Sequence, residues 1–131
     1  RRSSDLKFPF PMSVEEALSY IKNKLEIPVL RYAGNRDRLV EKIAILGGAG
    51  AEFAEVAKSM GADLYLTGDL KYHEAQDAAM NGLVIADGGH FYTERVIIPY
   101  LAKRLRDEFK TRGWNVGVLE DVRAKDIFHC V

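Results

Sequence analysis

Three short apolar segments, each followed by a glycine-containing turn and then by helical spacing, constrain this sequence more than any other feature. The apolar segments span residues 40–46, 63–67 and 83–86. Repeated strand–turn–helix units are typical of layered α/β folds, in which helices cover the faces of a largely parallel sheet. We therefore predict an α/β/α arrangement around a largely parallel or mixed central sheet, with right-handed crossovers between the strands.

Apolar spacing and capping residues predict the other elements. Ser13 and Glu16 have the spacing of a capping box, which favours a helix that starts directly after Ser13. Pro99 lies within the last helical segment, where it should kink the helix or mark its effective start. The predicted helices span residues 14–25, 51–60, 71–80 and 90–112, and further strands are expected at 27–33 and 114–119.

The beginning of the chain differs in composition from the rest. The first twelve residues are polar and then proline-rich, so we expect a linker or arm over 1–12 and a single α/β domain over 13–131. A chain of 131 residues is long enough to bury one sizeable core. Because the chain begins with arginine instead of methionine, we expect a trimmed chain or a fragment of a longer protein.

Charge and cysteine content narrow the partners and the compartment. The 19 basic and 19 acidic residues give a net charge of zero, whereas nucleic-acid binding favours a basic face, so we expect no nucleic-acid partner. The single cysteine, Cys130, excludes a disulfide within one chain and fits a reducing, cytoplasmic compartment. No apolar run approaches the roughly 20 residues that span a bilayer, so we expect no membrane association.

The first of three unusual strand ends is the glycine-rich turn 47–50. In parallel sheets, ligands gather beyond the carboxyl ends of the strands, and glycines there let backbone amides approach a phosphate. Phe53 stands where a dinucleotide-binding motif would have its third glycine. The turn is therefore open to three interpretations, which are a tight turn that needs glycine, an anion contact, or a nucleotide site.

The second strand end carries Asp69 and His73. Asp69 fits either an N-cap of the following helix or the polar wall of a cleft. His73 fits either a solvated surface group or a residue that transfers protons or contacts substrate. We retain both residues as candidate catalytic groups.

The third strand end carries His90 and Glu94 at the start of a predicted helix. Their spacing of four places both side chains on one helix face. An imidazole and a carboxylate suit zinc, iron or manganese, although a histidine beside a solvated glutamate also occurs without a metal. Two ligands do not complete a metal site, because a catalytic zinc normally takes three protein ligands and a water.

Three segments in register, 44–50, 61–75 and 87–94, resemble the C-terminal half of the Nif-three-like family, whose members are often called type 2 GTP cyclohydrolase I. The resemblance implies two α/β halves that enclose a dinuclear metal cleft, assembled into a hexameric ring. It also implies that His90 and Glu94 are metal ligands. The other family ligands, a histidine pair and an acidic residue, belong to the N-terminal half. Because this sequence contains no His-His pair, the resemblance implies either a fragment whose N-terminal half is missing here or a natural protein without a complete site.

By this resemblance, the chain contributes part of the site of a metal-dependent hydrolase that acts on a nucleotide or another phosphoester. Two bound divalent metals would lower the pKa of a bridging water. Asp87 is expected to orient His90, and Asp69 and His73 to contact substrate or relay protons. One alternative is an interaction or regulatory module whose metal is structural. The other is a nucleotide-binding domain centred on Gly48 to Gly50.

Overall fold

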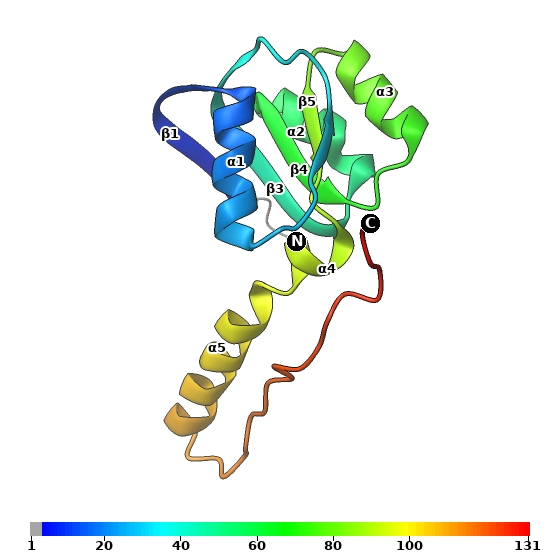
Figure 1. Cartoon of the computed structure of the whole chain (residues 1–131). Helices are drawn as coiled ribbons and strands as arrows, with labels where there is room; N and C mark the ends of the chain where they lie inside the picture. Colours follow the sequence, from blue (N-terminus) through cyan, green and yellow to red (C-terminus); the bar gives the residue numbers. More distant parts are fainter. Residues whose placement is uncertain (1–3) are drawn as a thin grey trace.

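A mixed five-stranded sheet, in the order β1-β3-β4-β5-β2, forms the centre of the protein (Figure 1). The computed structural model describes residues 4–131, with side chains from residue 7 onward. The three central strands are parallel, and each edge strand is antiparallel to its neighbour. The predicted α/β fold with a mixed sheet is therefore confirmed. The strands are β1 (Ser4–Ser13), β2 (Arg31–Ala33), β3 (Leu39–Ala49), β4 (Leu64–Gly68) and β5 (Val84–Asp87).

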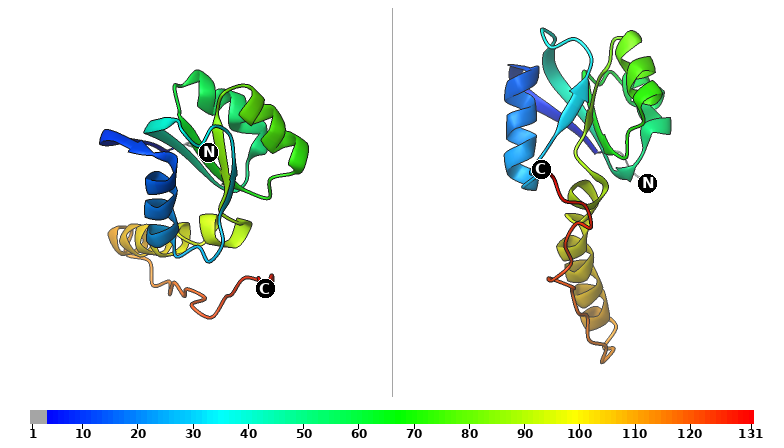
Figure 2. Two further views of the ribbon diagram at one scale, coloured as in Figure 1. Left: turned by 45° about the horizontal axis from the view of Figure 1, so that its top comes forward. Right: turned by 45° about the vertical axis from the view of Figure 1, so that its right-hand side comes forward.

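Helices cover both faces of the sheet. Helix α1 (Val14–Leu25) lies on one face, and α2 (Ala54–Ser59) and α3 (Tyr72–Met80) lie on the other (Figure 2). A short 3-10 helix, η1 (Ala51–Phe53), precedes α2. Strands β3, β4 and β5 follow one another across the sheet in chain order, so two right-handed crossovers place α2 and α3 on the same face.

The core consists of two apolar clusters, one on each face of the sheet. Leu64 and Leu66 of β4 pack in the cluster that contains α1, whereas Tyr65 between them packs in the cluster of α2 and α3. This alternation follows from the two-residue period of a strand. Every residue of β4 is buried, as expected of a central parallel strand covered on both faces.

Helix α1 forms where its sequence pattern predicts it. The hydroxyl of Ser13 accepts a hydrogen bond from the backbone N–H of Glu16 at 3.2 Å. The carboxylate of Glu16 accepts one from the backbone N–H of Ser13 at 2.9 Å, which completes the capping box. The buried side chains, at helical spacing, are Val14, Ala17, Leu18 and Ile21.

The start of the chain is a strand where the sequence predicted a linker or arm. Residues 4–13 form β1 and pair with β3, while residues 1–3 lie outside the described residues. Pro9 and Pro11, which suggested the linker, lie between Lys7 and Met12, where the register of β1 shifts. An edge strand with an irregularity accepts proline, because the lost N–H need not enter the ladder.

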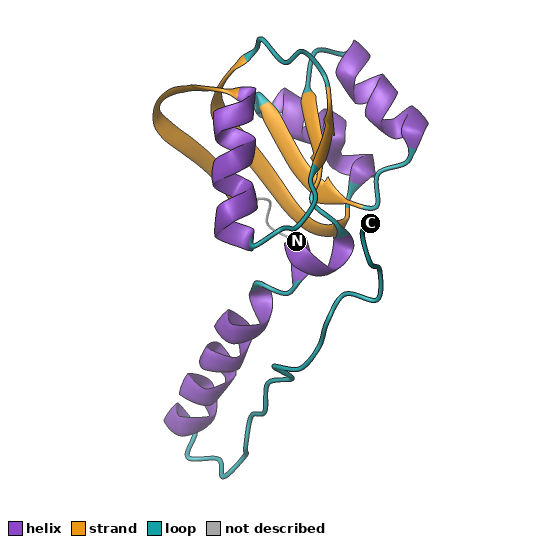
Figure 3. Ribbon diagram, viewed as in Figure 1, coloured by secondary structure: helices purple, strands orange, loops and turns teal. Residues whose placement is uncertain are grey.

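The prediction of a last strand over 114–119 was wrong. After Gly113 the chain returns beside the last helix without regular secondary structure (Figure 3). Arg106 holds this segment, through 3.0 Å hydrogen bonds to the Glu120 carboxylate and the Val118 carbonyl. The apolar residues that suggested a strand find no sheet face to cover, and Leu119 is 98% exposed.

The long helix predicted from residue 90 is divided into α4 (His90–Glu94) and α5 (Ile97–Thr111). Pro99 is the third residue of α5, within the first turn, where backbone N–H groups have no helical partner. Its role as a marker of the helix start is confirmed. Helix α5 projects away from the sheet (Figure 1), and Ala102 is its only buried residue. Within residues 4–131, no helix is long and apolar enough to cross a membrane.

Candidate functional site

The carboxyl ends of β3 and β4 and the turn after β5 converge on the start of α4. Gly48, with φ of 73°, lies so close that a Cβ atom there would be 2.8 Å from Glu94 Oε1 and 3.2 Å from His90 Nε2. A Cβ atom on Gly68 would be 2.9 Å from the backbone carbon of Gly89. These positions require glycine because neighbouring groups occupy the space of a side chain. Residues 47–49 belong to β3, whose register with β4 shifts between Ile45 and Ala49, so the tight turn expected over 47–50 is instead an irregular strand end.

Asp69, His90 and Glu94 form one hydrogen-bonded cluster in the structure. His90 Nδ1 lies 2.6 Å from Asp69 Oδ2, and His90 Nε2 lies 3.0 Å from Glu94 Oε2. About half of each side chain is exposed. The hydrogen bond to Asp69, reinforced by the charge of Glu94, raises the pKa of His90 above its ordinary value despite partial desolvation.

The cluster offers two donor atoms to a metal ion. Asp69 occupies Nδ1 of the imidazole, which leaves Nε2 and the Glu94 carboxylate on the other side. Ligands about 2.1 Å from one ion are roughly 3 Å apart when they subtend a right angle, as in octahedral coordination. The 3.0 Å separation of Nε2 and Oε2 meets this condition. Among the described residues, no group of three or more His, Cys, Asp or Glu side chains could hold a metal.

Three hydroxyl groups hold the glycine-rich turn in place. Thr93, which is buried, accepts a hydrogen bond from the Gly48 N–H at 3.0 Å and donates one to the Gly89 carbonyl at 2.8 Å. Thr67 donates to the Gly48 carbonyl at 2.9 Å, and the Tyr65 hydroxyl donates to the Gly50 carbonyl at 2.6 Å. The Gly48 amide is therefore occupied by a side chain, which disfavours a phosphate contact there.

Sequence reasoning missed the two threonines as site residues. Thr67 and Thr93 are fully or almost fully buried, and both bind the backbone of Gly48 near the end of β3. The sequence features that could have indicated them are a threonine at the end of an apolar strand, Thr67, and a threonine inside the 87–94 segment, Thr93. Neither position revealed its partner, because the partner lies in another part of the chain.

Asp87 does not contact the His90 side chain, contrary to the expectation that it orients this residue. Its Oδ2 accepts hydrogen bonds from Arg31 and from the Leu70 N–H, and its Oδ1 accepts one from the Gly89 N–H at 3.0 Å. Asp69 orients the imidazole instead. Asp69 itself has φ of 55°, a left-handed conformation that aspartate tolerates better than most residues.

His73 lies apart from the cluster. It is the second residue of α3, its side chain is exposed, and its Nδ1 lies 3.3 Å from Gln76 Oε1. Within residues 4–131, no hydrogen bond or ion pair joins it to Asp69, His90 or Glu94. A role for His73 in substrate contact or proton transfer remains a prediction.

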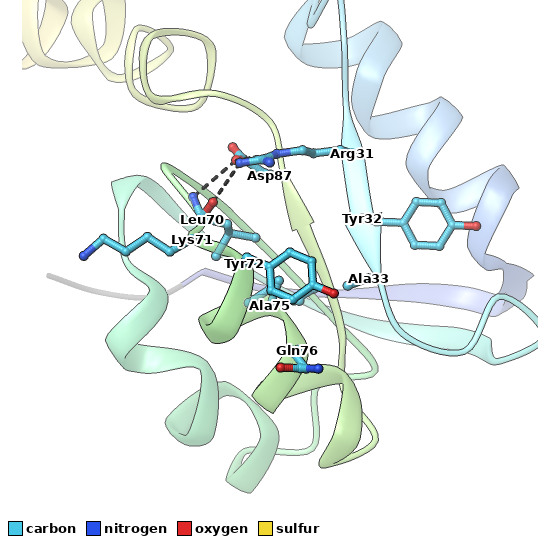
Figure 4. A pocket seen from close by; sticks show the side chains of 10 residues that line it. Arg31, Tyr32, Ala33, Leu70, Lys71, Tyr72, Ala75, Gln76 and Asp87 are labelled. Carbon is cyan, nitrogen blue, oxygen red and sulfur yellow. Dashed lines mark hydrogen bonds and ion pairs between the residues drawn. The ribbon is translucent and has the colours of Figure 1, made fainter.

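Two hollows flank the turns. A cleft of about 800 Å³ lies beside the cluster, where Asp69, His90 and Glu94 face the start of α5 and residues 120–128. A smaller cavity of about 300 Å³ lies between β2 and α3 (Figure 4). Its lining includes Arg31, whose guanidinium group points at Asp87 and the Leu70 carbonyl.

Comparisons with known proteins agree on one family. Residues 4–125 match the family described as Duf34/NIF3 (NGG1p interacting factor 3). A Staphylococcus aureus protein named GTP cyclohydrolase 1 type 2 homolog is 37% identical over 120 residues, which are 92% of this chain and 32% of that protein. A Clostridium perfringens protein of the same name is 36% identical over 92% of this chain and 45% of that protein.

A solved structure is also closely similar. The crystal structure of a Bacillus cereus protein related to NIF3 superposes with a TM-score of 0.90 and 33% identity, over 100% of this chain and 36% of that one. The chain thus spans less than half the length of each of these relatives.

Proposed function

We propose, from the premise that this chain belongs to the Duf34/NIF3 family, that it provides part of the metal site of a metal-dependent hydrolase. The observation that carries the proposal is the side-by-side placement of His90 Nε2 and Glu94 Oε2, 3.0 Å apart, with Asp69 on Nδ1. A carboxylate on the far nitrogen is the usual support of a metal-binding histidine, because it fixes the tautomer and raises the basicity of the ligand.

His90 and Glu94 would hold a divalent ion, with zinc, iron and manganese all compatible with nitrogen and carboxylate donors. The bound metal would supply Lewis-acid activation of water and of the substrate's electrophilic atom. The Asp69 carboxylate would accept a hydrogen bond from the Nδ1–H group of His90 and so keep Nε2 directed at the ion. Because Gly48 has no side chain, it leaves space for the side chains of Glu94 and His90, which any larger residue there would contact.

The remaining ligands must come from outside this cluster, because two donors do not complete a catalytic site. We propose that they come from the N-terminal half of the longer protein, that a second ion completes a dinuclear centre, and that the whole forms a homo-oligomer, a hexamer by the family resemblance. The relatives' name points to a nucleotide substrate, and hydrolysis of another phosphoester fits the same chemistry.

Metal analysis of the intact protein tests the proposal. Mass spectrometric metal content should be close to stoichiometric in the wild type and strongly reduced in His90→Ala and in Glu94→Ala. His73→Ala is the matched control, because His73 is exposed and lies outside the cluster, so it should keep the wild-type content. Unchanged metal content in both ligand variants would contradict the assignment.

The exposed apolar surface of α5 favours a second candidate, an interaction module in which the metal is structural. Ile97, Tyr100 and Leu101 are each about half exposed. A turnover screen of the intact, metal-loaded protein against nucleotides and phosphoesters separates the two candidates. Hydrolysis that disappears in Glu94→Ala supports the enzyme, whereas a loaded protein without turnover supports the module.

A further inference from the structure

A single carboxylate joins the two turns that carry Asp69 and His90. Asp87 Oδ2 accepts a hydrogen bond from the N–H of Leu70, the residue after Asp69, at 3.2 Å. Asp87 Oδ1 accepts one from the N–H of Gly89, the residue before His90, at 3.0 Å. The turn after β4 and the turn after β5 are therefore held by the same side chain, one residue away from each partner of the Asp69–His90 hydrogen bond.

Arg31 completes this arrangement from the edge strand β2. Its Nε and Nη2 donate to Asp87 Oδ2 at 3.1 and 2.8 Å, and Nη2 also donates to the Leu70 carbonyl at 2.7 Å (Figure 4). Leu70 is thus held on both sides, by Asp87 at its N–H and by Arg31 at its carbonyl. The guanidinium group also balances the charge of a carboxylate whose side chain is only 9% exposed.

We propose that Arg31 and Asp87 are positioning residues that set the distance between Asp69 and His90 and so select the tautomer of His90. Neither side chain touches the imidazole. Their effect passes through the backbone of Leu70 and Gly89, which limits how far the two turns can separate. Two carboxylates compete for the proton of the neutral imidazole, Asp69 at Nδ1 and Glu94 at Nε2. The contact with Asp69, at 2.6 Å, is shorter than the contact with Glu94, at 3.0 Å, so it favours the form of His90 that carries its proton on Nδ1.

The pattern of donors explains why a carboxylate is needed at position 87. Every group that faces Asp87 is a donor, namely two backbone N–H groups and a guanidinium. In Asp87→Asn, either orientation of the amide sets its NH2 group against one of the two backbone donors, so one turn is released. In Arg31→Gln, the charge and the bridge to the Leu70 carbonyl are lost while the Asp87 carboxylate remains.

The first test needs no metal. Long-range ¹H–¹⁵N imidazole spectra of the intact, metal-free protein are recorded as the pH is raised, and the tautomer is read on the alkaline plateau, where the His90 shifts no longer change and the imidazole is neutral. His90→Ala assigns the His90 signal among the 3 histidines of this chain. We expect the Nδ1–H form in the wild type and a mixture with the Nε2–H form in Asp87→Asn and Arg31→Gln. Arg36→Gln, at an exposed ion pair with Glu15, is the matched control and should resemble the wild type.

Two results would overturn the proposal. One is a wild-type spectrum in both variants, and the other is an equal tautomer mixture in the Arg36→Gln control. Arg31→Gln keeps the test valid if Asp87→Asn does not fold, because Arg31 is largely exposed.

A second measurement compares the metal affinity of the wild type with that of the two variants, and it rests on the proposed function. Loss of a residue that supports a metal ligand typically lowers affinity about 10- to 100-fold, and we expect this in both variants. A wild type that binds no metal would refute the proposed function and leave the tautomer result standing. A wild type that binds metal no more tightly than the two variants would refute the positioning role.

Discussion

Gly48 brings the backbone of β3 against the side chains of His90 and Glu94 more closely than a larger residue permits. Its φ of 73° is one constraint, and the position of Glu94 Oε1, 2.8 Å from where a Cβ atom would lie, is an independent one. The first disfavours any L side chain, and the second displaces a proposed metal ligand. At residue scale, the glycine therefore affects both stability and the site.

Gly48→Ala should destabilise the protein by more than the cost of backbone strain alone, which is about 1–2 kcal/mol for a left-handed residue. It should also weaken metal binding, because the new methyl group meets Glu94 and His90. Gly61→Ala is a matched control, since Gly61 has φ of 84° and nothing within 4 Å of its Cβ position. Urea denaturation and metal titration of both variants measure the difference. Equal effects of the two substitutions would contradict the steric argument.

Thr93→Val should cost about 1–3 kcal/mol, because it leaves the buried N–H of Gly48 without its acceptor while it preserves the side-chain shape. Thr111→Val removes a similar hydroxyl, bonded to the Asp107 carbonyl at the exposed end of α5, and should change stability little. Chemical denaturation of both variants gives the comparison. A Thr93→Val protein as stable as Thr111→Val would show that the hydrogen bond to the turn is dispensable.

The residues of the candidate site were only partly predictable. The spacing of His90 and Glu94 indicates a shared helix face, because that relation is local in the sequence. The contact of Asp69 with His90 crosses 21 positions and depends on how two turns meet. For the same reason, sequence reasoning assigned the orientation of His90 to Asp87, its near neighbour, instead of Asp69.

At the scale of elements, Asp63 fastens the beginning of β4 to β3. Its Oδ2 accepts hydrogen bonds from the N–H groups of Glu41 and Lys42, at 2.9 and 3.0 Å, and its Oδ1 accepts one from Arg38 at 2.8 Å. Burial by itself would raise the pKa of Asp63. The hydrogen bonds from Arg38 and the two backbone amides outweigh burial and hold the pKa below its usual value.

Asp63→Asn should lower stability near neutral pH by about 1–3 kcal/mol, since an amide cannot satisfy all three donors. Because the folded pKa lies below the unfolded one, the carboxylate stabilises the fold above the unfolded value, about pH 3.9, and this is lost as pH falls through the folded value. The difference in unfolding free energy between wild type and variant should therefore become smaller in acid. Unfolding free energies from pH 7 to pH 2 measure it, and a gap independent of pH would contradict the assignment.

Helices and central strands were predicted more accurately than edge elements. Helix α1 begins at Val14 as its capping box indicates, and β4 lies within one residue of its predicted bounds. The edge strand β1 was missed, and 114–119 was assigned as a strand. Capping and apolar periodicity are local signals, whereas an edge strand exists only if a distant segment pairs with it.

At the scale of the whole molecule, α5 and the segment after Gly113 form an arm that extends away from the central sheet (Figures 1 and 2). Arg106 on α5 joins its partners at Val118 and Glu120, 12 and 14 positions later. The Glu120 side chain is only 23% exposed. Trp114 also contacts the end of α5, through a 2.9 Å hydrogen bond from its N–H to the Phe109 carbonyl and through the Arg112 guanidinium over its ring. Beyond Trp114, Arg106 therefore fastens the returning segment to α5 without a backbone ladder.

Arg106→Ala should release residues 116–131 from α5 and leave the sheet intact, while Trp114 stays in place through Phe109 and Arg112. Limited proteolysis should become faster within residues 116–122 and stay unchanged in β3 and β4. Arg104→Ala is the matched control, because Arg104 contacts Tyr100 within the same helix at 3.4 Å. Equal rates of cleavage within residues 116–122 in both variants would contradict the role of Arg106.

By itself, the sequence determined the α/β class, the helices with capping residues or strong periodicity, and the placement of His90 beside Glu94, because each depends on residues close along the chain. Only the tertiary structure decided that Asp69 orients His90 and that Thr93 binds Gly48. It alone also showed that Arg31 and Asp87 hold two turns together. These contacts join residues from separate turns and strands, and their partners are set by the pairing of strands in the sheet.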